Sequence, residues 1–353
     1  GALSKEELQY VDRFNQRLVF IKGSYSEEHS NIGAAGIEVK FFKDVKDSTV
    51  IKESLIAYPS ENAFASLNKA FLHQAVWLDV KADVSIKDPI HVIHVNGGKH
   101  EALNPRLVVT AGKHSKVNVL QSYVSFNDDD YFTNAVTDIY AAAGATVDYC
   151  QLQAESLNAK HIATTRIELG KDSEVNAFNF SLGAKFTRNN TDAFLKEEAS
   201  FVNLDGLYAV KDKQHVDNHS LIDHEKPNAK SHQTYKGVLA GESHAVFNGK
   251  VLVREGAILT DSVQLNKNLL LSKKSKIDTK PELDIANDDV KCAHGATVGQ
   301  VNPEEIFYFQ SRAIPEDVAR SLLVRGFVAD VFEKVKSDKV RVLLEELLEE
   351  RYF

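Results

Sequence analysis

A cysteine and a histidine stand two residues apart, at Cys292 and His294, near the end of a long series of strand-like segments. In an extended segment, side chains two positions apart point to the same side of the backbone, so this thiol and imidazole share a face. Both groups can bind iron or zinc once the thiol has lost its proton. Two ligands do not complete a structural zinc site, which normally has four. The spacing alone favours a buried cysteine beside a hydrogen-bonded histidine, with a metal-ligating pair as the alternative.

The elements that would position this pair show a recurring pattern between about residues 90 and 300. An apolar strand is followed by a small or glycine-containing turn and then by a second strand, with few helical segments between them. This pattern favours a stacked β-solenoid, with a β-sandwich as the alternative. Glycine permits positive φ at the corners of such a coil. The turn glycines are Gly112, Gly144, Gly170, Gly241 and Gly256.

After residue 300 the pattern becomes helical. Asn302 and Pro303, followed by two glutamates, form a strong helix start, because asparagine caps the first turn and proline suits its first position. Pro315 opens a second helix and Ser337 a third. We expect these helices to cover the solenoid, and exposed apolar residues on them would mark a surface for another protein.

Several spaced segments together resemble one family, the SufB/SufD scaffold proteins of the sulfur-mobilisation (Suf) iron–sulfur assembly machinery. The segments that carry the resemblance are residues 291–299 and 304–312, the upstream blocks 264–271 and 278–283, and residues 62–71 followed by Pro89 and Ile90. The likeness extends from about residue 60 to about residue 335. Gly295 stands where SufB proteins typically carry a glutamate, which indicates the SufD branch of the family.

The resemblance implies a mostly β fold with a right-handed parallel β-helix core. It divides the chain into a mixed α/β region (residues 1–85), the β-helix (86–300) and a helical domain (301–353) that binds the SufC ATPase. The implied function is that of a scaffold subunit, not an enzyme, which pairs with a SufB-like paralogue and a SufC-like ATPase so that a nascent cluster is built and transferred. A homodimer is the alternative assembly of the isolated chain.

The resemblance also assigns residues. His294 and Cys292 would lie at the cluster-assembly interface, with His294 a transient metal ligand shared with the paralogue. No cofactor would be bound stably by this chain alone, and the iron–sulfur cluster would be transient in the complex. The residues expected to face SufC are Phe307, Tyr308, Arg312 and Phe327.

Five histidines gather between residues 215 and 244. They are His215, His219, His224, His232 and His244. Nearby acids make a zinc site one interpretation. The other, which the family resemblance favours, is a ladder of side chains on stacked strands or a subunit contact. Cys150 lies in an alternating strand and is expected to be a core residue.

Composition excludes several classes of function. The net charge of −8, without a cluster of basic and aromatic residues, makes a nucleic-acid partner unexpected. No apolar run reaches the roughly 18–20 residues of a membrane span. The first residues have no signal-peptide pattern, so we expect a cytoplasmic protein. No phosphate-binding loop is present. The alternative function is a carbohydrate-active β-helix protein such as a polysaccharide lyase.

Overall fold

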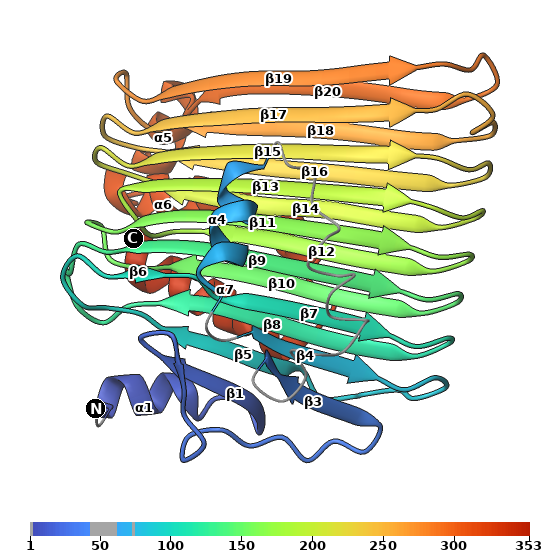
Figure 1. The fold of residues 1–353 in the computed structure, drawn as a ribbon. Helices are drawn as coiled ribbons and strands as arrows, with labels where there is room; N and C mark the ends of the chain where they lie inside the picture. The colour runs from blue at the N-terminus through green and yellow to red at the C-terminus, as the bar shows by residue number, and fades with distance from the viewer. Residues whose placement is uncertain (1–2, 43–61, 73–74) are drawn as a thin grey trace.

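The computed structural model describes residues 3–42, 62–72 and 75–353. The chain forms a flattened parallel β-solenoid in which two long sheets face each other and successive coils stack along one axis (Figure 1). Mixed strands precede the solenoid and helices follow it. The predicted parallel β-helix fold is therefore confirmed, and the β-sandwich alternative is excluded because nearly all strand pairs are parallel.

Sheet A runs in the order β2-β1-β5-β8-β10-β12-β14-β16-β18-β20. Its strands are β1 (Gln16–Ile21), β2 (Ser24–Tyr25), β5 (Ile90–Val95), β8 (Lys116–Val124), β10 (Thr146–Ala154), β12 (Glu174–Ser181), β14 (Phe201–Val210), β16 (Lys230–Leu239), β18 (Asp261–Leu270) and β20 (Lys291–Gln300). In the part of this sheet that the structure describes, β1–β2 is the one antiparallel pair of strands.

Sheet B runs in the order β19-β17-β15-β13-β11-β9-β7-β4-β3, with β6 beside β9. Its strands are β3 (Ile37–Phe41), β4 (Ala75–Val80), β6 (Ala102–Leu103), β7 (Arg106–Ala111), β9 (Phe132–Ala141), β11 (Lys160–Leu169), β13 (Phe186–Leu195), β15 (His215–His224), β17 (His244–Val253) and β19 (Lys276–Ile285). Among the described strands of this sheet, only β3 and β4 form an antiparallel pair.

Alternating side chains fill the interior of the solenoid. In sheet A, Val117, Val147, Val175 and Val202 stand in register on four neighbouring strands, and all are buried in the central apolar cluster. Because each strand exposes alternate side chains to opposite faces, one such column buries a continuous apolar surface along the axis.

The corners of the coils correct one expectation from the sequence. Gly144, Gly241 and Gly256 have positive φ, but Gly112 and Gly170 do not. Their neighbours His114 and Asp172 take the left-handed conformation instead, with φ of 55° each. A Cβ on Gly112 would lie 2.6 Å from the backbone nitrogen of Ala82, so this glycine is needed for the close approach of two coils.

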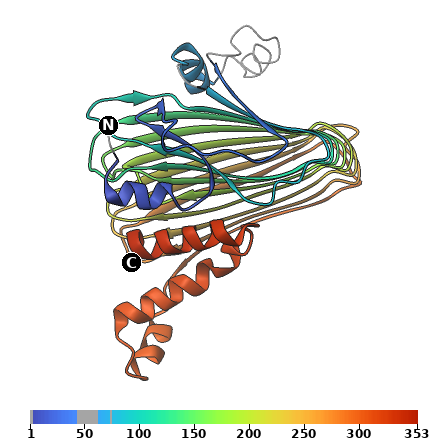
Figure 2. The same ribbon diagram turned by 90° about the horizontal axis from the view of Figure 1, so that it is seen from below.

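Five helices are described, and each sheet has at least one helix packed on its outer face. The helices are α1 (Lys5–Val11), α4 (Ala63–Ala70), α5 (Pro303–Gln310), α6 (Glu316–Phe332) and α7 (Asp338–Tyr352). The predicted caps Asn302 and Ser337 each accept a hydrogen bond from the first turn of their helix. Helices α6 and α7 pack on the outer face of sheet A, and α4 lies on the opposite side of the solenoid, against sheet B (Figure 2). None of the described helices is both long and apolar enough to cross a membrane.

Candidate functional site at the open end of the solenoid

The pair predicted from the sequence lies on the last strand of the solenoid. β20 pairs with β18 on one side and forms the edge of sheet A, as β19 forms the edge of sheet B (Figure 1). Most of β20 is exposed, whereas the strands one coil earlier alternate between buried and half-buried positions. The solenoid therefore ends in two ten-residue edge strands that no described element covers.

Cys292 and His294 lie on the interior-facing side of β20. Cys292 is half-buried and packs against the central apolar cluster, which fixes the face toward which it points. His294, two residues on, is on the same face of the strand and is exposed. The register places Cys292 opposite Ser262 and His294 opposite Gln264 on β18. Cys292 and His294 thus lie at the open C-terminal end of the solenoid, between the edge strands β19 and β20, which we call the mouth.

The surroundings of the Cys292 thiol disfavour its ionised form, the thiolate. Burial raises the pKa of Cys292, and the carboxylate of Asp261 raises it further, against a hydrogen bond from the Ser262 backbone that lowers it. At neutral pH the thiol is therefore largely protonated. Only the thiolate is a good metal ligand, so binding of iron by Cys292 would have to displace the thiol proton.

The residues expected to face SufC separate into two groups. Phe307 and Tyr308 on α5 are 71% and 55% exposed, and Arg312 lies 3.8 Å over the ring of Tyr308. Phe327 on α6 is half-buried and packs against the cluster that joins the helices to sheet A. Lys236 of β16 lies 4.7 Å over its ring.

The five histidines do not converge. His215 and His244 stand in register on the outer face of sheet B, with ring centroids 4.8 Å apart, and Phe186 stacks on His215 from the other side. This is the predicted ladder. His219 lies on the same outer face and pairs with Asp217 at 2.9 Å.

The other two histidines point elsewhere. His224 is buried and bonds to Ser231, and burial lowers its pKa to about 4. His232 makes a T-shaped ring contact with Phe201. Among the described residues, no group of three or more His, Cys, Asp or Glu side chains is placed to hold a metal ion.

Cys150 is buried, as expected for a core residue. It lies on the outer face of sheet A, in the cluster that the helices cover, rather than in the interior of the coil. Burial raises the pKa of its thiol well above the ordinary range.

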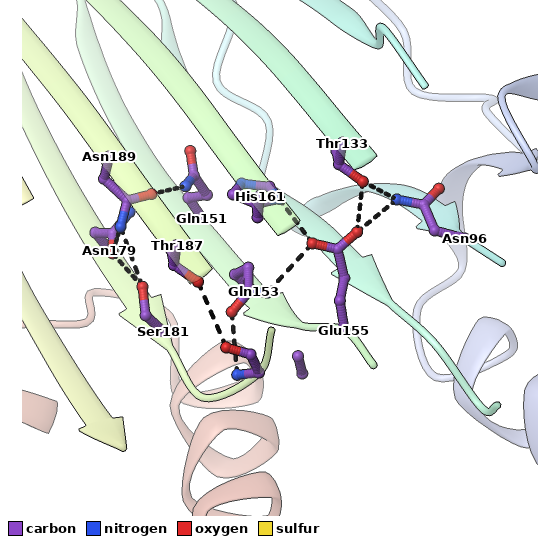
Figure 3. A network of polar contacts seen from close by, with 12 residues as sticks. Asn96, Thr133, Gln151, Gln153, Glu155, His161, Asn179, Ser181, Thr187 and Asn189 are labelled. Carbon is purple, nitrogen blue, oxygen red and sulfur yellow. Dashed lines mark hydrogen bonds and ion pairs between the residues drawn. The ribbon is translucent and has the colours of Figure 1, made fainter. Parts of the chain in front are cut away.

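A polar network in the interior was missed by the sequence analysis (Figure 3). The carboxylate of Glu155 accepts four hydrogen bonds, from Asn96, Thr133, Gln153 and His161, at 2.6 to 3.2 Å. Glu155 and His161 are completely buried. The available signal was the polar residues at interior positions of otherwise apolar alternating strands, such as Gln151 and Gln153 on β10.

The parallel β-solenoid is the class of fold that the resemblance to the SufB/SufD family implies. Residues 93–327 match the family described as "SUF system FeS cluster assembly, SufBD core domain". This chain therefore belongs to the SufBD family and is an iron–sulfur cluster assembly protein of the SUF system.

Individual relatives agree with this family assignment. An iron–sulfur cluster assembly SufBD family protein of Synechocystis is 33% identical over 345 residues, which cover 94% of this chain and 76% of the relative. The iron–sulfur cluster assembly protein SufD of Escherichia coli is 30% identical, with 92% of this chain and 76% of the relative covered. SufD of Bacillus subtilis is 26% identical, with 82% and 67% covered. The match gives no support to the lyase alternative.

Proposed function

We propose that the chain is the SufD-type scaffold subunit of a complex with a SufB-like paralogue and a SufC-like ATPase, without enzymatic activity of its own. The observation that carries this proposal is the open end of the solenoid. Two long edge strands offer unpaired backbone groups to another chain, and such edges are normally blocked or covered in a monomer. The isolated chain would then pair with a second copy through the same edges.

His294 is the residue that we assign to the cluster, which is the cargo of the complex. It is exposed at the mouth of the coil, on a strand that would lie at the contact between subunits. A neutral imidazole ligates iron without a large deprotonation cost, whereas the thiol of Cys292 is held protonated. A site that takes few ligands from each subunit can release its cluster when the subunits move.

The proposal includes the division of the chain into three regions. Residues 1–85 precede the β-helix of residues 86–300, and residues 301–353 would form the SufC-binding domain. Its support is the exposed apolar surface of α5 and the start of α6, where Val318 and Leu322 are 44% and 41% exposed.

The test is cluster reconstitution on the assembled complex. His294→Ala should lower the cluster content several-fold while the fold and subunit contacts stay intact, and Cys292→Ala should do less. Iron and sulfide per complex, absorbance and gel filtration measure these outcomes. Full cluster content in the His294→Ala complex, or its failure to assemble with the paralogue, would leave His294 with a structural role only.

A further inference from the structure

The interior side chains of sheet A change from apolar to polar in the strands next to the open end. Two columns of interior side chains end at Cys292 and His294. In β8, β10, β12 and β14, both columns are mostly apolar. In the two strands nearest to the mouth, β16 and β18, both columns are polar. The column that ends at Cys292 holds Val117, Val147, Val175, Val202, Ser231 and Ser262, and the column that ends at His294 holds Val119, Tyr149, Ala177, Leu204, Gln233 and Gln264.

The glutamines of the second column form a row of two hydrogen bonds, which runs from Gln264, the one nearer the mouth, to Gln233 and then across the interior to sheet B. Gln264 donates from Nε2 to Oε1 of Gln233 at 2.7 Å. Gln233 donates from its own Nε2 to the hydroxyl of Ser220, across the interior on β15, at 2.8 Å. Both glutamines are buried, with 0% and 1% of their surface exposed. These two bonds orient both amides, with Nε2 of each glutamine as a donor.

A glycine in sheet B makes room for this row. Gly249 of β17 has no side chain, and a Cβ there would lie 2.4 Å from Nε2 of Gln264 and 3.1 Å from Oε1 of Gln233. The two amides thus occupy the space that an interior side chain of β17 would otherwise fill. The polar row is accommodated by both sheets rather than by sheet A alone.

The row ends in an acceptor without a donor. Among the described residues, Oε1 of Gln264 has no hydrogen-bond partner, although the atom is buried. A buried acceptor left unsatisfied costs roughly 1–3 kcal/mol. His294 stands opposite Gln264 on the next strand, where neighbouring strands are about 4.8 Å apart, and its imidazole can supply an N–H.

We propose that Gln264 is a positioning residue for His294. Its Oε1 accepts a hydrogen bond from one imidazole nitrogen, which fixes the tautomer and directs the other nitrogen's lone pair toward the mouth. Histidines that bind metals are commonly held this way, by an acceptor on the nitrogen that does not bind. The proposal rests on the assignment of His294 as a ligand of the cluster and names the residue that prepares it.

The test reads the tautomer of His294 by nitrogen NMR of the full-length, histidine-labelled chain, well above the ordinary imidazole pKa of about 6.5. The His294 signals are identified by their loss in His294→Ala. One tautomer should predominate, and Gln264→Met should reduce the tautomer ratio by about two- to tenfold, the range that one hydrogen bond supplies. Gln264→Glu keeps an acceptor oxygen and should preserve the preference.

Ser262→Ala is the matched control, because Ser262 lies at the same depth in the neighbouring column, opposite Cys292. It should leave the His294 tautomer unchanged. An unchanged ratio in Gln264→Met, an equal shift in Ser262→Ala, or loss of the preference in Gln264→Glu would each overturn the proposal.

The tautomer measurement and the cluster reconstitution can fail independently of each other. If His294→Ala loses cluster content but Gln264→Met leaves the tautomer unchanged, the role of Gln264 is rejected and the ligand role of His294 stands. If the tautomer depends on Gln264 but His294→Ala keeps its cluster, the contact is supported and the ligand role is rejected.

Discussion

The carboxylate of Glu155 shows how a single residue can be held charged inside a solenoid. Burial by itself would raise its pKa, but the charge of His161 and the hydrogen bonds from His161, Thr133 and Asn96 outweigh burial and hold the pKa below the ordinary 4.5. A carboxyl group with a lowered pKa in the folded state stabilises the fold above its unfolded pKa. That contribution is lost as the pH falls through the folded-state pKa, below about 4.5.

Replacing this carboxylate should therefore destabilise the protein in a pH-dependent way. We expect Glu155→Gln to lower the free energy of unfolding near neutral pH by about 3 kcal/mol, because removing one member of a buried pair leaves the other unpaired. The difference from the unmodified chain should shrink in acid. Urea unfolding at several pH values measures both effects.

Glu168→Gln is the control for the first effect. Glu168 also pairs with a cation, Arg166, at 2.7 Å, but it lies on the outer face of sheet B and is partly exposed. Its loss should cost about 1 kcal/mol or less. Equal losses in the two variants, or a Glu155→Gln difference that persists in acid, would contradict an ionised, paired Glu155.

At the scale of elements, the C-terminal helices divide their apolar residues between two surfaces. The second half of α6 packs on sheet A, where Phe332 contacts the rings of Phe178 and Phe180. Lys236 of β16 holds this part of the helix through the carbonyl of Phe327 and the carboxylate of Asp330. Helix α5 and the start of α6 project away from the sheet (Figure 2).

A charge on the projecting surface should weaken binding of the ATPase. We expect Phe307→Glu to reduce affinity for a SufC-like subunit by about tenfold, equivalent to about 1.4 kcal/mol, because Phe307 is an exposed aromatic that such an interface would bury. Phe71→Glu is the control, since Phe71 is 62% exposed beside α4 on the other side of the solenoid. Calorimetry or pull-down measures the difference, and an equal effect of both substitutions would remove α5 from the interface.

A charge at Phe327 would also affect SufC binding, but the binding measurement has to be interpreted differently for this residue. Because its ring packs under Lys236, a charge at Phe327 would also disturb the docking of α6 on the β-solenoid. Reduced binding in a Phe327 variant counts as loss of an ATPase contact only if thermal unfolding shows that the helix remains docked.

At the scale of the whole molecule, the two ends of the solenoid differ. At the N-terminal end the sheets finish in the antiparallel strands β2 and β3, and β2 has two residues. At the C-terminal end they finish in β19 and β20, each of ten residues and with no described element over them. Long uncovered edges are expected to recruit another strand, so the proposed assembly should use the C-terminal end of the solenoid.

A substitution at Val298 tests whether the C-terminal end of the solenoid is the interface. Val298 lies on β20 and is 49% exposed, and a lysine there would place a charge in the contact between two solenoids. Val298→Lys should weaken pairing with the SufB-like paralogue by tenfold or more, about 1.4 kcal/mol, and should shift the isolated chain toward the monomer. Sedimentation measures both.

Ile258→Lys serves as the control for Val298, because Ile258 is 45% exposed in the corner between β17 and β18 and should leave pairing unchanged. If Val298→Lys pairs as tightly as the unmodified chain, the open end is not the interface.

Much of this architecture follows from local patterns. The recurring strand–turn–strand pattern favours the solenoid, Asn302 and Ser337 mark the starts of helices, and the spacing of Cys292 and His294 places both on one face of a strand. These features depend on residues a few positions apart, whose relative directions are fixed by the geometry of the strand or helix itself.

Other features depend on which residues of different coils meet. Residues that stand opposite each other on neighbouring strands lie 26 positions apart for Lys160 and Phe186 but 32 apart for His244 and Lys276, so no fixed period in the sequence gives the register. The stacked His215 and His244, the polar row under His294 and the opposite surroundings of Phe307 and Phe327 were therefore decided by the tertiary structure. Packing across coils, rather than the preference of any one segment, determines them.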